Sequence, residues 1–284
     1  TSGGRACANA SLAGTNLARD SECCRRTTVM AVTDLEYAPK GLIGALTPQA
    51  NTTVEPEFAI LWPPGYAMIN ARLTSPHGTI EARLRDYWKT TEASLDQFAN
   101  APISAVAFGC TGATYLAGKD EEDALVARIE DARGYPFVTS ARAVCDALDT
   151  MGARRIGLVS PYPDALTKAS IHYWESRGLT IGECARAFNP DSEFHPIYSL
   201  GAASATEALA LLRAKPVDAI VMLGTGMPTL TPIARAVGWD GPPVMSCMLC
   251  LAWRTVHAVD GQALSPHSLM SWVNGTHWSG RLRT

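Results

Sequence analysis

An approximate internal repeat divides the chain into two halves. Residues 43–48 have the sequence IGALTP, and residues 156–161, which lie 113 positions later, have the related sequence IGLVSP. Residues 110–112 (CTG) recur as residues 224–226 (GTG), 114 positions later. Two such similar offsets predict two pseudo-symmetric halves. Matching strand ends of such halves face a shared cleft, and this is where open α/β sheets bind their ligands.

A third similarity supports the same division. Residues 138–140 (VTS) match residues 244–246 (VMS) at an offset of 106 positions, which one difference in loop length reconciles with the other two offsets. The informative position is the one at which the halves differ. A thiol at Cys110 stands opposite a bare glycine at Gly224.

Short apolar runs alternate with helical patterns along both halves. Strands are predicted at residues 41–46, 104–108, 137–138, 155–159, 179–183, 218–223 and 244–245. Helices are predicted at residues 81–99, 119–133, 140–151, 164–177, 205–215, 231–237 and 249–259, with Ser140 as a candidate N-cap. This alternation indicates parallel sheets with right-handed crossovers. We therefore expect an α/β fold of two pseudo-symmetric, doubly wound lobes with the active site in the cleft between them.

The repeat also predicts the domain limits. Residues 30–138, together with a C-terminal helix at about residues 247–260, should form the first lobe, and residues 139–246 the second. Residues 1–29 are rich in Ser, Thr, Ala and Gly and have no helical or strand period. We expect them to be a disordered or non-native extension, with an ordered extension as the alternative, and we expect residues 262–284 to be an irregular tail.

Composition narrows the range of partners and compartments. The formal net charge is −3 and the Lys and Arg residues are scattered, so nucleic acid and membrane surfaces are not expected partners. Apolar runs such as residues 219–223 are too short to span a bilayer. The eight cysteines occur in a long chain with no apolar signal segment, which favours reduced thiols in the cytoplasm. The sequence does not predict an oligomeric state.

Cys110 is the leading candidate for a catalytic residue. It follows a predicted buried strand and precedes Thr111 and Gly112, where backbone N–H groups can stabilise a thiolate. Such a thiol can give or take a proton near neutral pH. A buried, inert cysteine is the structural alternative, and the matched placement of the repeat favours the chemical role.

Polar groups at the ends of the matching strands form the expected substrate-binding site. Turns that are rich in N–H and hydroxyl donors hold a carboxylate or an oxyanion, although ordinary turn chemistry explains each residue singly. The candidates are Asn51, Thr52, Thr111, Gly112, Tyr162, Gly224, Thr225 and Gly226.

Other motifs exclude several classes of enzyme. Residues 247–250 (CMLC) have the C-x-x-C pattern, but no second Cys or His pair lies at zinc spacing. The six histidines form no metal motif, and no G-x-S-x-G, phosphate-binding loop or G-x-G-x-x-G is present. We therefore expect neither a metal nor a cofactor.

Taken together, the motifs resemble the Asp/Glu racemase superfamily, in the branch of arylmalonate decarboxylase and maleate cis-trans isomerase. The resemblance covers about residues 40–258, and it rests on residues 51–55 (NTTVE), residues 110–118 (CTGATYLAG), residues 160–162 (SPY) and the GTG at 224. It implies two pseudo-symmetric lobes, no cofactor, and one active-site cysteine position in each lobe. Those two positions are Cys110 and Gly224.

The resemblance also separates the possible reactions. Racemases of the superfamily use both cysteines, so Gly224 argues against racemisation. Arylmalonate decarboxylase keeps one cysteine, in its second lobe, and this chain resembles its mirror image. Residues 110–118 are similar to the decarboxylase loop that binds one carboxylate, and Tyr162 falls on a tyrosine that both enzymes use to hold substrate oxygen. In maleate isomerase the nucleophilic cysteine corresponds to Cys110, whereas a second cysteine and an asparagine are replaced here by Gly224 and Ser192.

Our first hypothesis is a cofactor-independent decarboxylase that acts on a substituted malonate. Poor solvation of one carboxylate favours loss of CO₂, the donors stabilise the enediolate, and Cys110 protonates it. The second hypothesis is a maleate-type isomerase in which Cys110 adds to the alkene carbon and the transient single bond rotates. An Asp/Glu-type racemase and a non-catalytic carboxylate-binding protein are further alternatives. All four take a small carboxylate or dicarboxylate.

Overall fold

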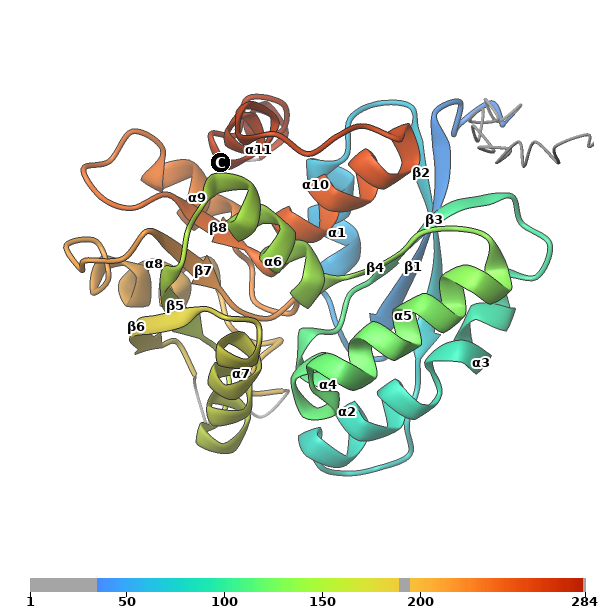
Figure 1. Ribbon diagram of the computed structural model, residues 1–284, viewed down its shortest axis with the longest axis horizontal. Coiled ribbons are helices and arrows are strands. Elements are labelled where there is room, and N and C mark those ends of the chain that lie inside the picture. The colour runs from blue at the N-terminus through green and yellow to red at the C-terminus, as the bar shows by residue number, and fades with distance from the viewer. Residues whose placement is uncertain (1–34, 189–194, 283–284) are drawn as a thin grey trace, which may run out of the picture.

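The computed structural model describes residues 35–188 and 195–282, and it divides into two lobes that lie side by side (Figure 1). The expected N-terminal extension (residues 1–29) and Ser192 lie outside the described residues. Each lobe contains a four-stranded parallel sheet. The prediction of an α/β fold with two doubly wound lobes is confirmed.

The two sheets have equivalent strand orders: in each, the first strand of the half lies between the second and the third, and the fourth is at the edge. The first sheet has the order β2-β1-β3-β4, with β1 (Gly41–Pro48), β2 (Tyr66–Leu73), β3 (Ile103–Phe108) and β4 (Phe137–Thr139). The second has the order β6-β5-β7-β8, with β5 (Arg155–Ser160), β6 (Thr180–Arg186), β7 (Ala219–Met222) and β8 (Val244–Ser246). The repeated IG motif thus lies on β1 and β5, each a central strand that is paired on both edges.

Helices connect the strands in both lobes (Figure 1). Those of the first lobe are α1 (Val54–Leu61), α2 (Ile80–Lys89), α3 (Thr91–Leu95), α4 (Thr111–Ala117) and α5 (Lys119–Arg133). Those that follow β5, β6 and β7 are α7 (Asp164–Ser176), α8 (Ala202–Ala210) and α9 (Leu230–Ala236). Two helices, α6 (Ser140–Met151) and α10 (Cys247–Asp260), pack against each other between the lobes, and α10 also contacts β3 and β4.

Three local predictions need correction. The single helix predicted at residues 81–99 is interrupted at Thr90, whose hydroxyl bonds to the Asp86 carbonyl at 2.9 Å, and it continues as α3 and a 3₁₀ turn at Asp96–Phe98. The N-cap of α6 is Thr139 rather than Ser140, because the Thr139 hydroxyl accepts the Arg142 N–H at 3.2 Å.

The tail is also more regular than expected. It contains helix α11 (Pro266–Val273), so the prediction of an irregular segment over residues 262–284 is wrong there. The Ser265 side chain caps this helix and Pro266 occupies its first turn, a local start signal that outweighs the lack of a visible period. An eight-residue helix is too short for its period to stand out.

Hydrogen bonds connect the lobes on both sides of the cleft. On one side the buried Glu57 of α1 accepts the Thr229 N–H at 2.6 Å. On the other side the buried Glu122 of α5 bonds to Tyr173 and Arg177, which belong to the second lobe. These contacts hold the two lobes together.

Two findings concern the cysteines and possible membrane segments. The five cysteines in the described part of the chain form no disulfide with one another. None of the helices in residues 35–188 and 195–282 has the length and apolar character that crossing a bilayer requires.

Candidate active site

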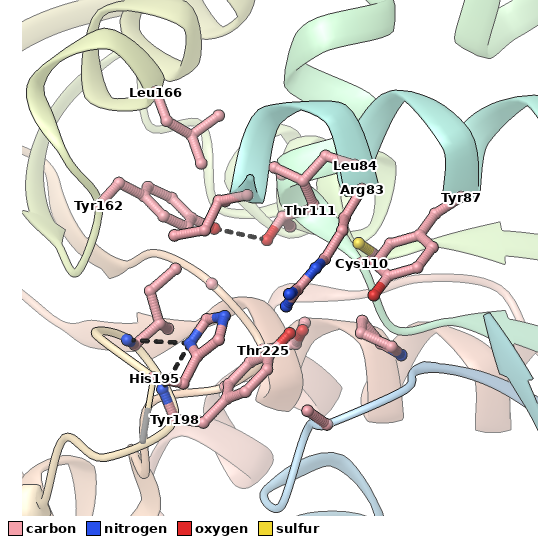
Figure 2. Close-up of a pocket in the computed structure, with 17 residues that line it drawn as sticks. Arg83, Leu84, Tyr87, Cys110, Thr111, Tyr162, Leu166, His195, Tyr198 and Thr225 are labelled. Atoms are coloured by element: carbon pink, nitrogen blue, oxygen red, sulfur yellow. Dashed lines mark hydrogen bonds between the residues drawn. The ribbon is translucent and has the colours of Figure 1, made fainter. Parts of the chain in front are cut away.

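One pocket lies where the carboxyl ends of β1, β3, β5 and β7 meet between the lobes (Figure 2). The pocket has a volume of about 520 Å³, part of which is open to solvent. The lining residues are Pro48, Ala50, Ile80, Arg83, Leu84, Tyr87, Cys110, Thr111, Gly112, Tyr162, Leu166, His195, Ile197, Tyr198, Gly224, Thr225 and Gly226. Cys110 and six of the eight predicted binding residues line this pocket, whereas Asn51 and Thr52 do not.

Cys110 lies on the wall of this pocket, at the N-cap position of α4. The preceding Gly109 N–H bonds to the Leu46 carbonyl at 2.9 Å, which continues the pairing of β3 with β1 up to the thiol. The side chain is almost fully buried, and burial raises the pKa of the thiol to about 12, although the Ala113 N–H opposes this. The expectation of a thiol that ionises near neutral pH is therefore wrong, because desolvation outweighs the backbone donor.

Thr111 and Tyr162 form a polar pair across the cleft. Their hydroxyl oxygens are 2.9 Å apart, and both side chains are buried. Burial raises the pKa of Tyr162 well above its ordinary value, so its hydroxyl stays protonated. The ring of Tyr115 packs edge-on against Tyr162 with 6.0 Å between centroids, which holds the phenol in place.

Different contacts explain why glycine occupies positions 224 and 226. Gly224 has φ +83°, and a Cβ there would lie 3.1 Å from the Tyr162 hydroxyl oxygen. A Cβ at Gly226 would lie 2.4 Å from two ring carbons of Tyr198, because that ring covers the backbone. Gly112 likewise allows Leu84 of α2 to approach the backbone of α4, since a Cβ at Gly112 would lie 2.9 Å from the Leu84 side chain.

Asn51 and Thr225 join the two lobes at the edge of the site. The Asn51 amide donates to the Thr225 carbonyl at 3.1 Å, and its Oδ1 accepts the N–H groups of Thr53 and Val54. The Thr225 hydroxyl donates to the Gly109 carbonyl at 2.7 Å. Both residues therefore use their donors on protein groups and position the loops that carry Cys110 and Gly224.

Thr52 does not belong to this pocket. Its side chain is exposed and lies beside a separate groove together with Pro228 and Leu282. The neighbouring Thr53, which the sequence did not single out, faces the second lobe and donates to the Gly226 carbonyl at 2.9 Å. The expected binding loop thus contributes Asn51 and Thr53 to the junction of the lobes.

Sequence reasoning missed four polar residues that line the pocket. Arg83 and Tyr87 project from α2, and His195 and Tyr198 come from the segment after β6 (Figure 2). Ile80, Leu84 and Tyr87 have the spacing of one face of a helix, which predicts a helix here but does not show that this face borders a pocket. No pattern marked His195 or Tyr198.

Three of these four side chains are neutral near pH 7. The His195 Nδ1 accepts the N–H groups of Ile197 and Tyr198, and burial, with Arg83 second, lowers the pKa of His195 to about 4. Its ring stacks on that of Tyr198 with centroids 3.9 Å apart. Burial raises the pKa of Tyr87 to about 12 and that of Tyr198 further.

The electrostatic character of the pocket is therefore simple. Hydroxyl and thiol groups provide neutral donors, Arg83 provides a positive charge, and no Asp or Glu is among the described lining residues. In the described part of the chain, no three His, Cys, Asp or Glu side chains are grouped so that they could hold a metal ion. Neutral donors with one guanidinium suit a small anionic ligand.

The sequence is similar to those of known proteins. The family model of arylmalonate decarboxylase matches residues 43–268. A maleate isomerase from Pseudomonas putida is 24% identical over 243 residues, which cover 79% of this chain and 94% of that protein.

Solved structures share the fold. A maleate cis-trans isomerase mutant from Nocardia farcinica, with a covalently bound succinylcysteine intermediate, has a TM-score of 0.68 at 24% identity, covering 78% of this chain and 93% of the other. An arylmalonate decarboxylase has a TM-score of 0.64 at 21% identity, covering 80% of this chain and 96% of the other.

Proposed function

Because the chain belongs to the arylmalonate decarboxylase family, which its sequence matches over residues 43–268, we propose that it is an isomerase that converts maleate or a similar small cis-dicarboxylate to the trans isomer. Curated relatives named maleate isomerase support this reaction over our first hypothesis, decarboxylation.

The observation that carries the proposal is a thiol on the wall of a pocket whose described lining residues include no carboxylate. The hydroxyl donors and the Arg83 guanidinium of this pocket suit a small dicarboxylate.

In the proposed mechanism, the Cys110 sulfur adds to one alkene carbon of the substrate. The S–C bond forms, the C=C pair moves onto the adjacent carbon and its carboxylate, and the thiol proton passes to a substrate carboxylate oxygen. The former double bond then rotates as a single bond. Elimination breaks the S–C bond, restores the alkene in the trans form and returns the proton to sulfur.

The structure suggests a role for each neighbouring residue. The paired hydroxyls of Thr111, which follows Cys110 in the chain, and Tyr162 line the pocket and would hold the carboxylate on which negative charge develops. Asn51 and Thr225 act as positioning residues, because their hydrogen bonds hold the two loops together. Gly224 and Gly226 allow Tyr162 and Tyr198 to approach. We propose no binding role for Thr52.

Decarboxylation of a substituted malonate remains the second candidate because of one observation. The pKa of Cys110 is raised to about 12, so the resting thiol is protonated, which is the state that a proton donor needs and a nucleophile must leave. A single thiol opposite Gly224 also suffices to protonate one face of an enediolate.

Product analysis by NMR separates the two reactions. The wild-type protein is incubated separately with maleate and with phenylmalonate. We expect fumarate from maleate and no phenylacetate. Phenylacetate formation without fumarate would establish decarboxylation, and neither product would argue for a non-catalytic carboxylate-binding protein.

A further inference from the structure

Arg83 forms no salt bridge with any of the residues that the structure describes. Arg85, two residues later on the same helix, pairs with Glu81 at 2.9 Å. Arg83 is half-buried and lines the pocket, so its guanidinium can offer its positive charge to an anionic ligand.

The guanidinium is held in a fixed orientation. Its Nε donates to the His77 carbonyl at 2.6 Å, and its Nη2 lies 3.4 Å from the Gly78 carbonyl, both in the loop that precedes α2. Nη1 has no protein acceptor among the described residues. The side chain is thus pre-organised, with the Nη1 edge of the planar group left for a ligand.

Arg83 and the Thr111–Tyr162 pair come to the pocket from different elements. Figure 2 shows the guanidinium extending from α2, past this pair, toward His195 and Tyr198. Its charge also contributes, after burial, to the lowered pKa of His195. The pocket therefore combines a neutral pair of hydroxyls with a separate cationic group.

We propose that Arg83 binds the second carboxylate of the substrate, so that the site selects small dianionic dicarboxylates over monoanionic acids of the same length. This inference rests on the proposed function only in placing the reacting end of the substrate at Cys110. Arg83 is then a specificity-determining residue that takes no part in proton transfer or bond formation.

The test uses succinate and butyrate, which have four carbons each and differ by one carboxylate. Their affinities for the full-length protein are measured by calorimetry, and neither contains the alkene that the reaction needs. For Arg83→Leu we expect succinate binding to weaken by about tenfold to a hundredfold, as for loss of a charge-assisted pair, and butyrate binding to change by less than about threefold. Arg83→Lys should keep part of the preference.

Arg85→Leu is the matched control, because it removes an arginine from the same helix outside the pocket, and it should leave both affinities unchanged. Equal weakening of succinate and butyrate by Arg83→Leu would indicate a merely structural role and overturn the inference. An unchanged succinate affinity, or no binding of succinate to the wild type, would also overturn it.

Turnover separates this inference from the proposed function. If Arg83→Leu removes the preference for succinate while the wild type fails to isomerise maleate, the proposed function is wrong and the role of Arg83 stands. If the wild type isomerises maleate and Arg83→Leu leaves KM and the succinate preference unchanged, the role of Arg83 is wrong and the function stands. For Arg83→Leu, the inference predicts that the KM for maleate rises by a larger factor than kcat falls.

Discussion

Replacing Glu57 with Gln should stabilise the protein at alkaline pH. Glu57 is fully buried on α1, and burial raises its pKa from 4.5 to about 7, against the opposing bonds from Thr229. The folded state therefore favours the neutral carboxyl. Below pH 4.5 the carboxyl is neutral in both the folded and the unfolded state, and its burial costs no stability from charge. As the pH rises through 7 the buried carboxyl becomes charged, and the free energy of unfolding falls. The difference of about 2.5 pKa units corresponds to about 3 kcal/mol of unfolding free energy.

A glutamine fits the same hydrogen-bond pattern without this penalty. Its carbonyl oxygen can accept the Thr229 N–H, its amide can donate to the Thr229 hydroxyl, and that hydroxyl can donate to Ser246, which is 2.9 Å away. Urea unfolding of both proteins at pH 5 and pH 8.5 measures the effect. We expect Glu57→Gln to gain about 2.5 kcal/mol relative to wild type between those two pH values, because part of the effect is already present at pH 5.

The control is Glu207→Gln, which makes the same chemical change on the exposed surface of α8 and should show no such dependence on pH. A stability difference between Glu57→Gln and wild type that stays constant with pH would refute the reasoning. So would a difference that favours wild type more strongly at pH 8.5.

Two further predictions concern the residues around Cys110. Tyr162→Phe removes the hydroxyl that bonds to Thr111 and should lower kcat for maleate by about tenfold to a hundredfold, with little change in melting temperature. Steady-state kinetics measures this effect. An unchanged kcat would show that Tyr162 does not stabilise the developing charge. Gly224→Ala places a Cβ at φ +83° and 3.1 Å from the Tyr162 hydroxyl oxygen, so it should destabilise the fold by about 1–2 kcal/mol in urea unfolding. Gly201→Ala, at an open position without positive φ, is the control, and equal stabilities of the two variants would contradict the account.

Much of the architecture could be predicted because the repeat falls on strands and strand ends. In a parallel sheet the chain order and the strand ends determine which loops share an edge. This placed Cys110, Thr111, Tyr162 and the glycine loop of β7 around one pocket without any knowledge of side-chain packing. Helix α10 begins at the predicted CMLC motif, where the Ser246 side chain caps it.

The remainder of the site depends on tertiary contacts that leave no local pattern. Arg83 and Tyr87 reach the pocket only because α2 packs closely on α4 at Gly112, where a Cβ would lie 2.9 Å from Leu84. Tyr198 reaches it by lying over Gly226. The pKa of Cys110 was misjudged for the same reason, since desolvation depends on the whole surroundings of the thiol.

The central claim is that Cys110 carries the reaction of the pocket. The most direct test is the rate at which maleate is converted to fumarate, followed by proton NMR, for wild type, Cys110→Ala and Cys250→Ala. Cys250 is also buried, but it lies in α10 and does not line the pocket, so it controls for loss of a buried thiol. The account predicts that wild type and Cys250→Ala convert maleate to fumarate. Cys110→Ala should keep its fold and convert none. Conversion by Cys110→Ala at the wild-type rate would contradict it.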